Sequence, residues 1–166
     1  MKEWRLQIHP DKTRIVYCKD ADRQGEHECV SFDFLGFTFH PRLSKNKYGK
    51  IFVNFTPAVS KGALKAIREQ ARKYKMHLRC DKTIEDLSHM FGPVLRGWVN
   101  YYGNFCKSAM YPTLESINQR LVRWVMRKHK RFRRKPKAAA EWLREVAKRE
   151  PKLFVHWQMG IYPIGP

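Results

Sequence analysis

Basic side chains recur at helical spacing in the middle of the chain. Their positions step by 4, 3, 4, 3 and 4 between residues 61 and 79. Such steps keep side chains within an arc of about 80° on one face of a helix, because each residue turns by about 100°. Like charges at these spacings repel each other, so the pattern predicts a polyanion bound to this face, and Lys and Arg bind phosphates well. The predicted contacts are Lys61, Lys65, Arg68, Arg72, Lys75 and Arg79.

A second basic series starts at residue 120 and runs into the segment RKHKRFRRK, residues 127–135. Either series alone is equally compatible with an ordinary solvated helix face. Two series at the same spacing favour a track along which Lys and Arg replace the counterions of a nucleic acid. The predicted contacts of this series are Arg120, Arg123, Arg127, Lys128, Lys130, Arg131, Arg133 and Arg134.

An aromatic segment, LRGWVNYYGNF at residues 95–105, lies between the two series. Its aromatic residues step by 3, 1 and 3 positions, so a helix would present them on one face. We expect Trp98 and Phe105 to pack in the core. Tyr101 and Tyr102 are candidates for holding bases or sugars at the edge of the track. The predicted RNA contacts of this segment are Arg96, Tyr101 and Tyr102.

The four cysteines are widely separated, and none belongs to a Cys-x-x-Cys pair: Cys18, Cys29, Cys80 and Cys106. We therefore predict reduced thiols and no metal site. A zinc site of Cys18, His27 and Cys29 is a weaker alternative, because its spacing matches no standard zinc motif.

The elements that must position these residues change in type along the chain. Segment 13–18 is rich in β-forming residues, and apolar residues alternate in segments 30–40 and 50–55. This pattern predicts a small antiparallel sheet with loops at 19–29 and 41–49. Thr56 and Pro57 are expected to end the last strand.

Helical periodicity follows from residue 60 onwards. Ser60 is the expected N-cap of a first helix whose apolar stripe continues to Leu78. Thr83 and Asp86 predict a capping box for a second helix that runs towards Gly92-Pro93. A third helix is expected at about 112–130, a fourth at 138–149, and a docked apolar tail at 153–157. The predicted fold class is α+β, with short N-terminal antiparallel β-hairpins followed by a mainly α-helical bundle.

The net charge favours a nucleic acid as partner. The chain has 34 Lys and Arg residues against 15 Asp and Glu residues, a net charge of +19, and 43% of its residues are hydrophobic. A globular chain with this excess needs a polyanion to offset its self-repulsion. A membrane is less favoured, because no apolar run approaches the ~20 residues of a spanning helix. The N-terminal segment lacks the apolar core of a signal peptide, which predicts a cytoplasmic location.

Several segments, in order and spacing, resemble the C-terminal part of group II intron reverse transcriptase–maturases. They are LQIHPDKTRIVY, FDFLGFTF, the helix after Pro57, LRGWVNYYGNF and the basic third helix. The resemblance implies a partial palm edge at residues 1–56 and a helical maturase or thumb domain at residues 57–166 that binds intron RNA and flanks a template–primer duplex. It also implies close helix packing at Gly97 and Gly103.

The resemblance implies roles for two short motifs of the palm edge. Lys12 would lie on the pyrophosphate side of the polymerase active site. A primer-grip-like hairpin would be formed by Phe34, Leu35, Gly36 and Phe37.

The sequence departs from this family in its catalytic motif. Polymerase chemistry needs paired carboxylates that hold Mg²⁺ ions, and the family's Tyr-x-Asp-Asp turn is missing here. We therefore expect no catalytic residues and no bound cofactor, with Mg²⁺ belonging to a missing catalytic core. The chain would be a fragment, a truncated product or a stand-alone maturase module.

The predicted function is binding of group II intron RNA in support of splicing or retrohoming, without polymerase activity. One alternative is the thumb and primer-grip part of an active RNA-directed DNA polymerase, bound to an RNA/DNA duplex and associated with a polymerase core. Another is a general binder of double-stranded nucleic acids.

Overall fold

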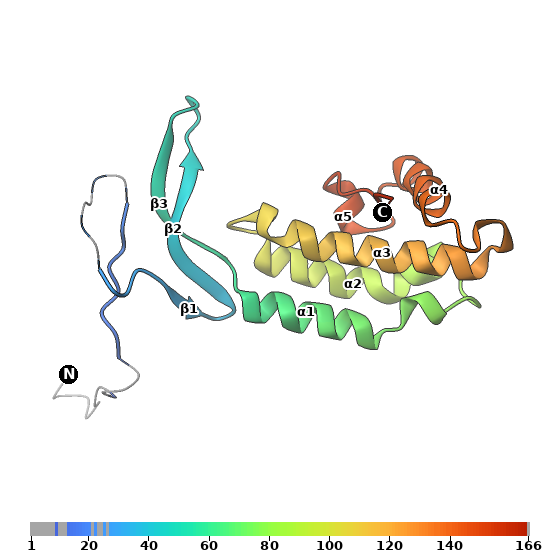
Figure 1. Ribbon diagram of the computed structural model, residues 1–166, viewed down its shortest axis with the longest axis horizontal. Helices are drawn as coiled ribbons and strands as arrows, with labels where there is room; N and C mark the ends of the chain where they lie inside the picture. The colour runs from blue at the N-terminus through green and yellow to red at the C-terminus, as the bar shows by residue number, and fades with distance from the viewer. Residues whose placement is uncertain (1–8, 10–12, 21, 23–24, 26, 166) are drawn as a thin grey trace. The chain divides into compact units, whose positions relative to one another are not determined.

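The computed structural model describes residues 9, 13–20, 22, 25 and 27–165 of the chain. The fold is α+β, as predicted: a three-stranded antiparallel sheet in the order β1-β2-β3 precedes a series of helices (Figure 1). The described residues form two compact units with a border between Pro57 and Ala58. Within the described part of the chain, no helix combines the length and apolar character needed to cross a membrane.

The first hairpin joins β1 (Phe32–Phe34) to β2 (Phe37–Lys45) through a two-residue turn. Leu35 and Gly36 have φ angles of 49° and 80°, as the turns that match the twist of a tight hairpin require. Glycine adopts such angles freely, so Gly36 favours this turn. Across the hairpin the rings of Phe32 and Phe39 are stacked with centroids 4.8 Å apart.

The second hairpin is longer than the sequence predicted. β2 continues through Pro41 to Lys45, and β3 (Ile51–Val59) continues through Pro57. The pairing with β1 covers only the first three residues of β2, so Pro41 lies beyond it and interrupts no ladder bond with β1. Pro57 lies on an edge strand, where the missing N–H is tolerated for the same reason.

The segment at residues 13–18, predicted as a strand, is irregular. The Tyr17 N–H donates to the Cys29 carbonyl at 2.9 Å, and the Tyr17 and His27 rings lie 3.8 Å apart. These contacts hold two stretches of chain together without a continuous ladder.

Helices make up the second unit. The α-helices are α1 (Lys61–Lys73), α2 (Ile84–Tyr102), α3 (Tyr111–Lys128), α4 (Pro136–Arg149) and α5 (Val155–Gln158). The 3-10 turns are η3 (Met76–Leu78), η4 (Lys107–Met110) and η5 (Lys130–Phe132). Both predicted caps are present. Ser60 Oγ accepts from Ala63 N at 3.1 Å, and Thr83 and Asp86 form the reciprocal capping box.

α1 is shorter than predicted. It ends at Lys73, and Lys75 adopts a left-handed conformation with φ 47°, where its N–H donates to the Arg72 carbonyl. The left-handed residue turns the chain so that Met76 lies in the core with none of its surface exposed. Leu78, which was predicted to belong to the apolar stripe, is 48% exposed. Burial of Met76 is the gain that offsets the strain of a non-glycine residue at this angle.

α2 is longer than predicted, since it passes through Gly92 and Pro93 and ends at Tyr102. A proline inside a helix costs about 3 kcal/mol through its missing N–H and its steric clash. Buried Leu87, Phe91 and Leu95 lie on both sides of this point, so packing of the helix face outweighs the local preference.

The C-terminal segment docks on the bundle through the fully buried Asn118. Its Nδ2 donates to the Glu115 carboxylate at 3.0 Å and to the Ile161 carbonyl at 3.1 Å. Its Oδ1 accepts from Trp157 Nε1 at 3.0 Å and lies 2.8 Å from His156 Nε2. Because an amide oxygen only accepts, His156 carries its proton on Nε2. Burial lowers the pKa of His156 to about 3, which keeps the ring neutral.

Candidate nucleic-acid interface

The first basic series is divided between a helix and a turn. Lys61, Lys65, Arg68 and Arg72 lie on α1, whose apolar Ile67 and Ala71 are buried. Lys75 and Arg79 lie beyond the end of α1, on either side of η3, so the series does not form one continuous helical stripe. Lys61, Lys65, Arg72, Lys75 and Arg79 are exposed, and Arg68 is half-buried.

The second series meets the first where α3 packs on α1 and η3. Arg120 is half-buried, and its burial, together with the charges of Arg123 and Arg72, lowers the pKa of its guanidinium. The effect of Arg72 is informative, because it shows that a basic residue of α1 lies close to one of α3.

His77 lies among the same cations. Burial, followed by the charges of Arg127, Arg120, Arg123 and Lys75, lowers the pKa of its imidazole. The structure therefore brings residues of both predicted series to one cluster around a histidine that sequence reasoning missed. Helical spacing could not reveal His77, because the early end of α1 is what places it beside α3.

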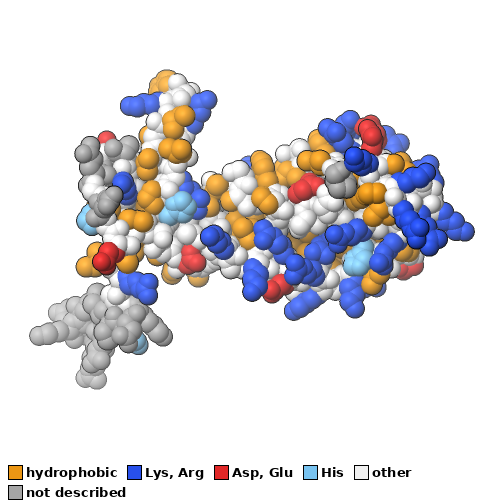
Figure 2. Space-filling model, in the orientation of Figure 1, with side chains coloured by type: hydrophobic (Ala, Val, Ile, Leu, Met, Phe, Trp, Pro, Cys, Tyr) orange, Lys and Arg blue, Asp and Glu red, His pale blue; other side chains and the backbone are white. Residues whose placement is uncertain are grey.

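Within the part of the chain that the structure describes, no acidic side chain pairs with these cations. Among the described residues, the ion pairs within 4 Å are Lys82–Asp81 at 3.4 Å and Lys148–Glu145 at 2.7 Å, and neither involves the α1 or α3 series. Figure 2 shows Lys and Arg side chains gathered over the part of the helical unit where α1 and α3 lie, with isolated acidic side chains between them. The surface is therefore free to attract phosphates.

Lys128 differs from the other members of its series. Its ammonium donates to the carbonyls of Cys80 and Lys82 at 3.1 Å and 2.7 Å and lies over the Trp124 ring. Trp124 Nε1 donates to the Arg79 carbonyl at 2.8 Å. These bonds fasten α3 to the turn between η3 and α2, so Lys128 is already occupied in holding that turn.

The basic residues after α3 are exposed and continue around a tight turn. Arg131 lies over the rings of Phe132 and Trp142, with its guanidinium carbon 4.5 Å and 5.8 Å from their centroids. Arg134 has a left-handed φ of 59°. All four predicted contacts after α3 are exposed: Lys130, Arg131, Arg133 and Arg134.

The aromatic segment forms the end of α2 and the turn after it. Trp98 packs against both hydrophobic clusters of the helical unit, as predicted. Phe105 lies beyond the helix and is 64% exposed, so its predicted core position is wrong. Tyr101 is 49% exposed and contacts the half-buried Tyr102 edge-on, with ring centroids 4.7 Å apart. Arg96 lines a groove between α2 and Lys152.

The two glycines of this segment do not mediate close helix packing. A Cβ at Gly97 would have no neighbour within 4 Å, whereas a Cβ at Gly103 would lie 2.5 Å from the Val99 carbonyl oxygen. The constraint at Gly103 is local, because this residue closes the end of α2.

In the first unit, the predicted primer-grip residues form the β1–β2 turn. Phe34 and Leu35 are 59% and 67% exposed, and Phe37 is buried. Gly36 has the positive φ angle of the turn. Lys12 lies outside the described residues.

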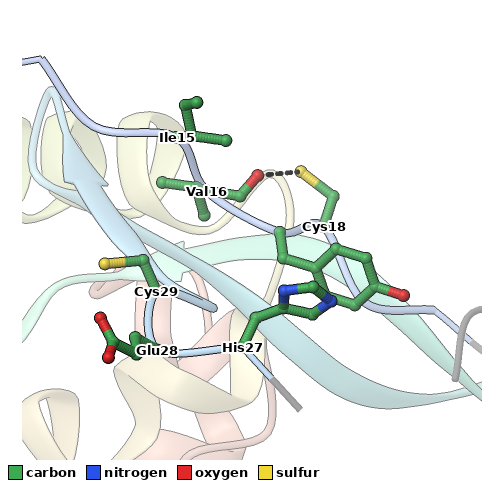
Figure 3. Close-up of a pocket in the computed structure, with 7 residues that line it drawn as sticks. Ile15, Val16, Cys18, His27, Glu28 and Cys29 are labelled. Carbon is green, nitrogen blue, oxygen red and sulfur yellow. Dashed lines mark hydrogen bonds between the residues drawn. The ribbon is translucent and has the colours of Figure 1, made fainter. Parts of the chain in front are cut away.

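The weaker zinc alternative receives no support. Figure 3 shows that the side chain of Cys29 points away from Cys18 and His27. The Cys18 thiol lies 4.0 Å from the Val16 carbonyl, and no group of three His, Cys, Asp or Glu side chains within the described ranges could hold a metal ion.

Residues 64–142 match the model of a family described as "Group II intron, maturase-specific domain". The match covers α2 and α3 completely and most of α1. No curated protein and no solved structure matches the chain.

Proposed function

A group II intron, maturase-specific domain occupies residues 64–142 of this chain, and on that premise we propose that its helical unit binds group II intron RNA and supports splicing or retrohoming. The observation that supports this function most is the meeting of the two basic series beside η3, without acidic partners among the described residues. RNA phosphates would supply the missing negative charge.

A salt-dependence experiment tests the proposal. Four first-series residues are changed to Gln together: Lys65, Arg68, Arg72 and Lys75. A matched control removes the same number of charges from α4 and the segment after it: Lys137, Arg144, Arg149 and Lys152. For an intron RNA, only the first variant should flatten the slope of log K against log salt, by roughly 0.7–0.9 for each phosphate that it no longer neutralises. If log K fell with log salt at the same slope in both variants, the RNA would not lie along the first basic series.

The RNA is expected to be held mainly through its backbone. Phosphate contacts fix register and carry no sequence information, so the four-Gln change should weaken binding of different RNAs to a similar extent. Changing Tyr101 and Tyr102 to Leu should leave the salt slope unchanged and lower affinity only where the rings stack on bases.

A second candidate is the thumb and primer-grip part of an RNA-directed DNA polymerase. The exposed Phe34 and Leu35 at the β1–β2 turn favour it, because a primer-grip hairpin must present its turn. The chain itself should not extend a primer on an RNA template with Mg²⁺, since its sequence lacks the Tyr-x-Asp-Asp carboxylates. Nucleotide incorporation by the purified chain would contradict this expectation.

A further inference from the structure

His77 occupies the junction at which the two basic series meet. It belongs to η3, which packs on α3 and follows α1 directly. The cations that act on it come from the residue before η3 and from the C-terminal half of α3: Lys75, Arg120, Arg123 and Arg127. Arg72, near the end of α1, acts in turn on Arg120.

The charges that face His77 are all of one sign. Arg120, Arg123 and Arg127 of α3 act on it from one side, and Lys75 acts from the preceding turn. Within the described part of the chain, no carboxylate contributes to the environment of this imidazole or pairs with these cations. Burial and like charge both disfavour the imidazolium, so the free protein keeps His77 neutral at neutral pH.

Two nitrogens of this cluster have no hydrogen-bond partner among the residues that the structure describes. His77 Nδ1 and Arg120 Nε are both buried from solvent, and neither has an acceptor or donor within reach. A buried N–H without an acceptor costs free energy, and the Arg120 Nε–H is such a group. A ligand rich in oxygen atoms would offset the repulsion between the guanidinium groups.

We propose that His77, the four cations that act on it and Arg72 beside Arg120 form a binding site for one phosphodiester of an RNA backbone, and that His77 takes up a proton from the solvent when the phosphate binds. This inference rests on the proposed function, because it specifies how part of the RNA surface works. Neither basic series predicts this proton uptake, since both consist of groups that remain charged at all physiological pH values.

Proton uptake follows from the change in local charge. A bound phosphate offsets the arginines that disfavour the imidazolium, so the pKa of His77 rises in the complex. The RNA then binds more tightly as the pH falls through the interval between the free and the bound pKa of His77. A single linked proton changes the affinity by at most about tenfold per pH unit.

The test measures binding of a fluorescent RNA hairpin to the full chain at about pH 5.5 and about pH 7.5, on either side of the ordinary histidine pKa of ~6.5. The wild-type protein should bind several-fold more tightly at the lower pH. His77→Gln should remove most of this gain. His89→Gln, a change at an exposed histidine of α2, should preserve it.

A second readout needs no variant. NMR titration of the wild-type imidazole protons should show a higher pKa for His77 with the hairpin bound than without it. An unchanged pKa of His77, or a pH dependence of binding that survives in His77→Gln, would contradict the phosphate site at His77 but not the binding of RNA. Failure of the hairpin and of intron RNA to bind at any pH would overturn the proposed function as well.

Discussion

Asn118 uses its whole hydrogen-bonding capacity inside the protein. Its amide donates twice and accepts twice, and its partners belong to α3, α5 and the chain after α5. A buried amide of this kind fixes one arrangement of the segments around it, because every alternative leaves polar groups without partners. The sequence predicted that segment 153–157 docks on the bundle, but nothing in it indicated that Asn118 receives the segment, since an isolated Asn on a helix carries no pattern.

Replacement of Asn118 by Leu should destabilise the protein strongly. The change keeps a similar volume but leaves the N–H groups of His156 and Trp157 and the Ile161 carbonyl without partners, and each such group costs roughly 1–3 kcal/mol. Urea unfolding measures the effect. The control is Gln119→Ala, which removes bonds made at a half-exposed position to Glu115 and Ile164. Similar destabilisation in both variants would contradict the role given to Asn118.

For the first two helices, local signals in the sequence predicted the start better than the end. The caps at Ser60 and Thr83 follow from side-chain chemistry within three residues. The end of α1 depends on Met76 finding a core position, and the passage of α2 through Pro93 depends on contacts with other helices. Such contacts lie far away in sequence, so periodicity alone could not predict them. For the same reason, periodicity revealed both basic series, but it could not reveal that they meet at His77.

The left-handed Lys75 provides a test at the scale of one element. Lys75→Gly should raise the free energy of unfolding relative to Lys75→Ala, by about 1 kcal/mol, because only glycine adopts this φ angle without steric cost. Thermal unfolding of the two variants gives the comparison. Both variants remove the same cation, so they should weaken RNA binding equally. A glycine variant no more stable than the alanine variant would show that the turn is not strained.

At the scale of the whole molecule, the two units differ in how well they cover their apolar side chains. The sheet unit leaves large residues exposed, including Leu43, Tyr48 and Ile51. In the helical unit, two clusters of buried side chains join the helices. A sheet with an exposed edge and apolar surface is prone to aggregate, whereas a bundle with its own core is expected to fold alone.

Residues 58–166 should therefore be more soluble than the full chain and should give cooperative thermal unfolding with a helical circular dichroism spectrum. Ser60 and the buried Val59 are kept in this piece, so the N-cap of α1 and its packing are preserved. An unfolded spectrum would mean that the helical unit requires the sheet for its stability.

The crowding of arginines without acidic partners has a consequence for the amount of folded protein. Repulsion among Arg72, Arg120, Arg123 and Arg127 opposes folding of the free chain and is relieved by any bound polyanion. If RNA binds the folded state alone, a concentration 100-fold above its Kd adds about 2.7 kcal/mol to stability. The RNA would then act as a partner in folding, and chains made in excess of it would be the first to unfold and be degraded.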